Sequence, residues 1–98
     1  MSRYYDQEGR PMSLMDWAAS YEDAAYRVVQ QTEVGGHFVS TVWLGLDHSF
    51  GGGAPLIFET MICAPSGEWL DYQERYSTKA EAEEGHKRAV AFAEAIPR

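Results

Sequence analysis

The central part of the sequence, residues 38–63, constrains the fold more than any other stretch. Two runs rich in β-branched and aromatic residues, 38–44 and 56–63, flank a loop that contains three consecutive glycines. Alternating side chains in such runs point to opposite faces of a sheet. The stretch therefore predicts two strands of an antiparallel sheet, joined by the loop 45–55.

Turn signals on either side extend this sheet to about four strands. Residues 26–34 are rich in β-branched side chains and end at Gly35-Gly36, a two-residue hairpin signal. On the other side, a Pro-Ser-Gly turn at residues 65–67 leads into a strand of mixed polarity at residues 69–76. Consecutive strands are usually neighbours in the sheet, so the sequence predicts a meander.

One helix is predicted before the sheet and one after it. Ser13 is a suitable N-cap for a short helix at residues 14–20, and Thr78 with Glu81 has capping-box spacing at the start of the last helix. The last helix carries a stripe built largely from small residues: Ala82, Gly85, His86, Ala89, Phe92, Ala93 and Ile96. Gly85 costs about 1 kcal/mol against alanine in a helix, which is consistent with a close approach to the sheet.

Together these elements predict one α+β domain that spans residues 1–98. It consists of an antiparallel sheet of about four strands, with the N-terminal and C-terminal helices packed on one face. A chain of this length forms a single hydrophobic core. Its large aromatic side chains make that core feasible without a metal or a disulfide.

Charge and cysteine content exclude several functional classes. The net charge of −7 argues against direct binding to DNA or RNA, and it favours a partner protein with a basic surface. Cys63 is the single cysteine, so no disulfide forms within the chain, which suits the cytoplasm. We expect no membrane span and no signal peptide, because no apolar run reaches about 20 residues and the first residues lack the basic-then-apolar order.

Strand alternation divides the predicted sheet into two faces. We expect a core face made of Phe38, Val42, Leu44, Leu56, Phe58, Ile62, Leu70, Tyr72 and Tyr76. We expect the opposite face to stay uncovered and to contact a partner through Trp43, Ile57, Glu59, Met61 and Trp69, with Asp47, His48 and Phe50 of the loop beside it. Uncovered apolar surfaces are typical of contact sites, where aromatic residues contribute much of the binding energy.

The sequence contains no recognisable catalytic set, metal site or cofactor motif. Asp47 and His48 form an acid–base pair by residue type, but a loop-stabilising bond of Asp47 is the simpler interpretation because no nucleophile motif accompanies them. The glycine run 51–53 lacks the Lys and the Ser or Thr of a phosphate-binding loop. The histidines and Cys63 lack zinc-ligand spacing. We therefore predict no cofactor and no bound metal.

Most of the chain resembles a group of small proteins encoded by phages and prophages, especially those of actinobacteria. The resemblance rests on three strings: RYYDQEGRP, STVWLGLDHSFGGGAPLIFETM and ERYSTKAEAEEGHKRAV. It implies no catalytic residues. It does imply a setting in which small acidic proteins bind host proteins, including as inhibitors of defence systems such as CRISPR complexes.

These features predict a non-enzymatic protein–protein interaction protein of phage origin in the cytoplasm of the host cell. We expect it to mask a host defence complex of CRISPR type, or another nucleic-acid-handling complex, through the uncovered face and the loop 45–55. Two alternatives stay open. One is a homodimeric structural or accessory module that uses the same face on itself, and the other is a small enzyme that uses Asp47, His48 and Glu59.

Overall fold

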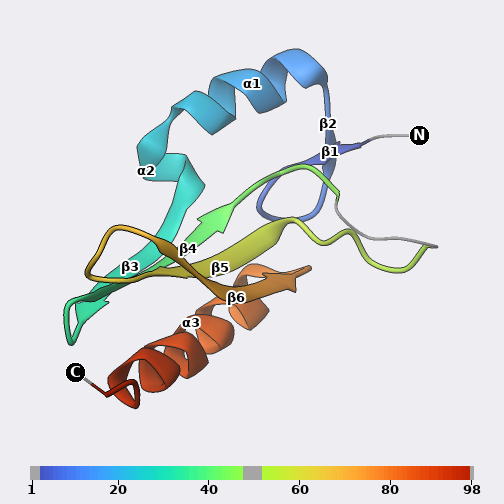
Figure 1. Ribbon diagram of the computed structural model, residues 1–98. Coiled ribbons are helices and arrows are strands. Elements are labelled where there is room, and N and C mark those ends of the chain that lie inside the picture. The colour runs from blue at the N-terminus through green and yellow to red at the C-terminus, as the bar shows by residue number, and fades with distance from the viewer. Residues whose placement is uncertain (1–2, 48–51, 98) are drawn as a thin grey trace.

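The structure, a computed structural model, describes residues 3–47 and 52–97 and has the α+β class that the sequence predicts (Figure 1). The elements follow in the order β1 (Tyr4–Tyr5), β2 (Pro11–Met12), α1 (Leu14–Glu22), α2 (Ala24–Arg27), β3 (Val28–Val34), β4 (His37–Trp43), β5 (Phe58–Cys63), β6 (Trp69–Tyr76) and α3 (Lys79–Glu94). The last four strands form one sheet in the order β3-β4-β5-β6, with every neighbouring pair antiparallel. The predicted four-stranded meander is therefore confirmed.

Local sequence signals explain where these elements begin and end. Gly35 and Gly36 form the β3–β4 turn with φ angles of 58° and 81°, the positive pair that a tight hairpin turn requires. The predicted first strand begins only at Val28, because Asp23 caps a short helix before it by accepting a hydrogen bond from the amide of Ala25. The capping box of α3 is confirmed, since Thr78 and Glu81 each accept a hydrogen bond from the other's backbone amide.

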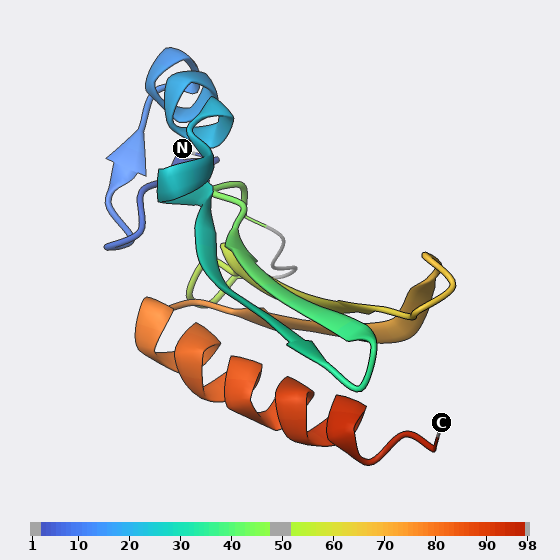
Figure 2. The ribbon, with the colours of Figure 1, turned by 90° about the vertical axis from the view of Figure 1, so that its left-hand side faces the viewer.

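Helix α3 lies along one face of the sheet and contacts all four of its strands (Figure 2). The small residues of its predicted stripe are buried there: Ala82, Gly85, Ala89 and Ala93. A Cβ atom at Gly85 would overlap the hydroxyl and ring of Tyr76 on β6. Glycine at this position is therefore required by the close contact between helix and sheet, as the sequence indicated.

Helix α1 does not share that face, which corrects one detail of the expected packing. Both views show α1 on the opposite side of the sheet from α3 (Figures 1 and 2). Two indole groups hold the N-terminal segment there: Trp17 Nε1 donates to the carbonyl of Leu44 at 2.8 Å, and Trp43 Nε1 donates to the carbonyl of Tyr5 at 3.0 Å. β1 also pairs with the chain that follows β4, through a 2.8 Å bond from the amide of Tyr5 to the carbonyl of Gly45.

The assignment of β4 to the two faces is the second correction. Trp43 lies opposite Phe58 and Val39 lies opposite Ile62, so Val39, Thr41 and Trp43 point into the core. Phe38 and Val42, which were expected in the core, lie on the other face. Trp43 and Ile57 were expected on an uncovered face, and this is wrong because both are 0% exposed. Alternation fixes the faces within a strand, whereas the pairing across the long loop 45–55 decides which face each strand presents.

We predict that Gly85→Ala destabilises the fold although alanine is the better helix former. The added methyl group meets the ring of Tyr76, and an overpacking cost of about 1–3 kcal/mol outweighs a propensity gain of about 1 kcal/mol. Chemical denaturation should show the loss, and the penalty should shrink in a Tyr76→Leu background, where the obstructing ring is absent. A Gly85→Ala protein as stable as the parent would show that α3 is free to move away from the sheet.

Candidate functional site

The face of the sheet opposite α3, here called the open face, is the candidate site. No helix that the structure describes lies across its centre, and α1 stands at one end of it (Figure 2). Strand pairing and alternation place these side chains on it: Gln31, Glu33, Phe38, Ser40, Val42, Glu59, Met61, Cys63, Trp69, Asp71, Gln73 and Arg75. The open face thus combines aromatic, aliphatic and acidic groups on regular strands.

An apolar patch occupies the hairpin end of the open face. Phe38, Cys63 and Trp69 lie in one row across three neighbouring strands, because Cys63 pairs with both of the others. Trp69 is 56% exposed and Phe38 is 36% exposed, while Met61 in the next row is partly buried. Two large exposed aromatic side chains in one row of a sheet are unusual for a surface that has no partner.

A hollow of about 430 Å³ lies at the other end, between α1 and the sheet. It is lined by Trp17, Tyr21, Leu44, Leu46, Glu59, Gln73 and Arg75. The rings of Trp17 and Tyr21 stack with their centroids 5.1 Å apart, and Tyr4 lies against the same indole at 5.0 Å. Gly45 allows this arrangement, because a Cβ there would collide with both Trp17 and Trp43. The hollow therefore has aromatic walls that are fixed by packing.

An ion pair forms the polar floor of this hollow. The Glu59 carboxylate accepts hydrogen bonds from Arg75 Nε at 3.0 Å and from Gln73 Nε2 at 2.8 Å. The Glu59 side chain is 12% exposed, so its charge is largely desolvated and is paired accordingly. Across the whole open face Glu33, Glu59 and Asp71 outnumber Arg75. The face is consequently acidic, in keeping with the net charge of −7.

The residues expected to contact a partner are distributed unevenly in the structure. Glu59, Met61 and Trp69 lie on the open face as expected, whereas Trp43 and Ile57 lie in the core. The remaining three belong to the loop: Asp47, His48 and Phe50. Asp47 Oδ1 accepts a hydrogen bond from the amide of Leu56 at 3.1 Å, which is the loop-stabilising role considered for it. His48 and Phe50 fall outside the described residues.

Sequence reasoning missed three members of the site. Phe38 was expected on the core face, and no contact with a partner was predicted for Trp17 or Tyr21. The spacing of four residues between Trp17 and Tyr21 does place them on one side of α1. The sequence pattern does not show that this helix lies at the edge of the open face.

A buried polar cluster under α3 is the second concentration of reactive groups. His86 is 1% exposed; its Nδ1 lies 2.7 Å from Thr41 Oγ1 and its Nε2 lies 2.8 Å from Thr32 Oγ1. Thr41 Oγ1 also bonds Thr60 Oγ1, to which the hydroxyl of Tyr76 donates at 3.1 Å. A neutral imidazole has one donor and one acceptor nitrogen, so both are satisfied here.

This cluster has the properties of a structural network. Thr41 and Thr60 are 0% exposed, and every hydroxyl of the cluster is engaged with its neighbours. It separates two apolar clusters of the core, one around Trp43 and Phe58 and the other around Val39 and Ile62. Burial lowers the pKa of His86 and raises the pKa of Tyr76, which favours the uncharged form of both groups.

Other kinds of site find no support in the described part of the chain. Among residues 3–47 and 52–97, no group of three or more His, Cys, Asp or Glu side chains is arranged to hold a metal ion. Within the same ranges, no helix has the length and apolar character needed to cross a bilayer. Comparisons of the chain with models of protein families, with curated proteins and with solved structures give no match.

We predict that stability falls as the pH is lowered from about 7.5 to about 5. Unfolded histidine takes up a proton near pH 6.5, whereas burial holds the folded pKa of His86 lower, so the unfolded state binds more protons in this range. The stability that His86 contributes is complete above pH 6.5 and is lost as the pH falls through its folded pKa. Urea denaturation at several pH values measures the free energy of unfolding and its dependence on pH.

The matched variant for this prediction is His86→Gln, which keeps a polar group without a titrating ring. It should be less stable than the parent at pH 7.5, and the difference should narrow towards pH 5. A constant difference over the whole range would mean that His86 does not titrate with unfolding.

Proposed function

We propose that this chain is a non-enzymatic binding protein whose open face masks a basic surface of a partner protein. The observation that carries the proposal is the exposed pair Phe38 and Trp69 on a sheet face that none of the described helices covers. The partner is a host protein or protein complex, as the resemblance to phage proteins implies.

The arrangement of the open face supports protein binding. Its two ends carry aromatic side chains, Trp69 in the apolar patch and Trp17 at the hollow, and polar side chains such as Ser40 lie between them. Protein interfaces commonly combine buried aromatic anchors with polar groups that fix orientation. The anchors here stand on paired strands, so little conformational freedom is lost when they are covered.

Charge supports a basic partner. The chain has a net charge of −7, and the described side chains of the open face include three carboxylates and one guanidinium. A field of this sign speeds the encounter with a surface rich in Lys and Arg. Such surfaces in host cells commonly bind nucleic acid. A protein that covers such a basic surface would block its contact with phosphates. We therefore favour an inhibitor of a nucleic-acid-handling complex, such as a CRISPR-type defence complex.

Self-association through the same face is the second candidate, because the patch of Phe38 and Trp69 is also available to another copy of the chain. A two-fold contact would bring the acidic residues of one open face towards those of the other. That repulsion favours a basic partner over a second copy. The enzyme alternative is less favoured because the Glu59 carboxylate already pairs with Arg75 and Gln73.

We predict that Trp69→Ser weakens partner binding at least tenfold, which corresponds to about 1.4 kcal/mol, without changing the fold. The host partner would first be captured with a photo-crosslinking residue in place of Met61 and identified by mass spectrometry. Its affinity for the purified variants would then be measured by calorimetry at several salt concentrations. Binding should weaken as salt rises, because the contact joins opposite charges.

The matched control is Met15→Ser, an exposed apolar residue of α1 that is 78% exposed and outside the hollow. It should bind like the parent. Light scattering of the free protein separates masking of a partner from self-association. A monomer that binds a basic partner supports masking. A dimer that Trp69→Ser dissociates supports self-association. If both variants and the parent bind the partner with equal affinity, the open face does not contact the partner.

A further inference from the structure

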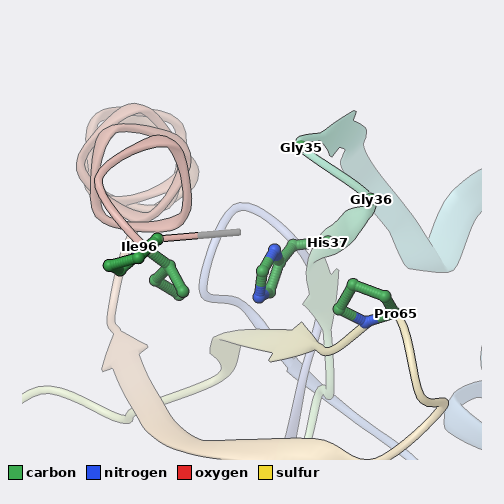
Figure 3. Close-up of a pocket in the computed structure, with 6 residues that line it drawn as sticks. Gly35, Gly36, His37, Pro65 and Ile96 are labelled. Atoms are coloured by element: carbon green, nitrogen blue, oxygen red, sulfur yellow. The ribbon is translucent and has the colours of Figure 1, made fainter.

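A second hollow, of about 550 Å³, lies at the hairpin end of the sheet on the side of α3. It is lined by Gly35, Gly36, His37, Pro65, Ile96 and Pro97. Three separate segments meet there: the β3–β4 turn, the β5–β6 turn and the chain that follows α3 (Figure 3). A volume of this size lies within the range of about 300–1,000 Å³ that is usual for small-molecule sites.

The walls of this hollow are apolar and preformed. Apart from the imidazole of His37, the described residues of the lining are glycine, proline and isoleucine. Gly36 packs so closely on Pro65 that a Cβ atom on it would lie 3.1 Å from Pro65 Cγ. This contact between two tight turns holds the rim in place, so a ligand would not have to create the cavity.

His37 supplies the one polar feature. The residue is only 7% exposed, and Figure 3 shows the imidazole between Pro65 and Ile96. Its Nδ1 is the one buried side-chain nitrogen or oxygen atom, among the residues that the structure describes, that has no hydrogen-bond partner. His86 makes the contrast clear, because both of its nitrogens are paired. A buried polar atom without a partner is rare in folded proteins and needs an explanation.

We propose that this hollow binds a small, mainly apolar molecule with a hydroxyl group that pairs with His37 Nδ1, after a rotation of the imidazole that brings this buried atom to the hollow. The apolar walls favour an aromatic or alicyclic body. A hydroxyl group both donates and accepts, so it satisfies Nδ1 in either neutral tautomer. A carboxylate or phosphate would instead be desolvated among proline and glycine, and none of the described lining residues carries a positive charge, which disfavours charged ligands. The inference is independent of the function proposed for the open face.

The probes are p-cresol and toluene, which have nearly the same shape and differ by one hydroxyl group. Each would be titrated into the protein while nitrogen-15 NMR spectra report the backbone amides and the His37 imidazole. We expect p-cresol to move the signals of His37 and of the residues lining this hollow, and to shift the imidazole nitrogens. Toluene should bind there about threefold to tenfold more weakly, because it leaves Nδ1 unpaired.

His37→Phe tests the same bond from the protein side. It keeps an aromatic ring without the nitrogen, so p-cresol should lose its advantage and bind no better than toluene. If this variant does not fold, the comparison of the two probes on the unchanged chain still decides the matter. No binding of p-cresol up to its solubility limit, equal binding of both probes to the parent, or signal changes confined to the hollow beside Trp17 would each overturn the proposal.

Discussion

The close contact between α3 and the sheet is the constraint on which the rest of the structure depends. Gly85 lets the helix descend onto Tyr76, and at that separation His86 reaches Thr32 on β3 and Thr41 on β4. Threonine occupies the centre of the inner face because these hydroxyls complete the imidazole's hydrogen bonds. One long helix thus covers the inner face, and the short α1 is left to occupy the edge of the other.

The position of α1 follows from a second constraint, the need for acceptors of two indole groups, one buried (Trp43) and one half-buried (Trp17). Trp17 and Trp43 each find a backbone carbonyl, and both bonds join the N-terminal segment to the region of β4. Gly45 leaves room for the two rings to approach each other. The same contacts that anchor the N-terminal segment therefore form one wall of the hollow at the end of the open face.

Much of the fold could be predicted from the sequence because its signals are local. The Gly35-Gly36 turn, the capping box of Thr78 and the small-residue stripe of α3 each act over a few residues, and all are confirmed. The face of β4 could not be predicted in this way. Its inward row contains His37 and Thr41, whose residue types are typical of solvent-facing positions. Only the structure shows that Thr41 pairs with His86 under α3.

The candidate sites also differ in how far they could be predicted, because some depend on local signals and others on contacts between distant segments. Trp69 and Met61 follow from alternation within their own strands, so their position on the open face could be anticipated. Trp43 could not, since its burial depends on the pairing of β4 with β5 across the long loop. The hollow at His37 could not be predicted from the sequence, because two turns and the chain after α3, which are distant in the sequence, form it together.

β4 is the element that the two proposed sites share. His37 and Phe38 are adjacent residues whose side chains point to opposite faces, one towards the hollow under α3 and the other onto the open face. A ligand at His37 touches the chain that follows α3, whereas a partner on Phe38 and Trp69 touches only the strands. The two sites are accordingly separate in their contacts, and each can be tested by substitutions that leave the other intact.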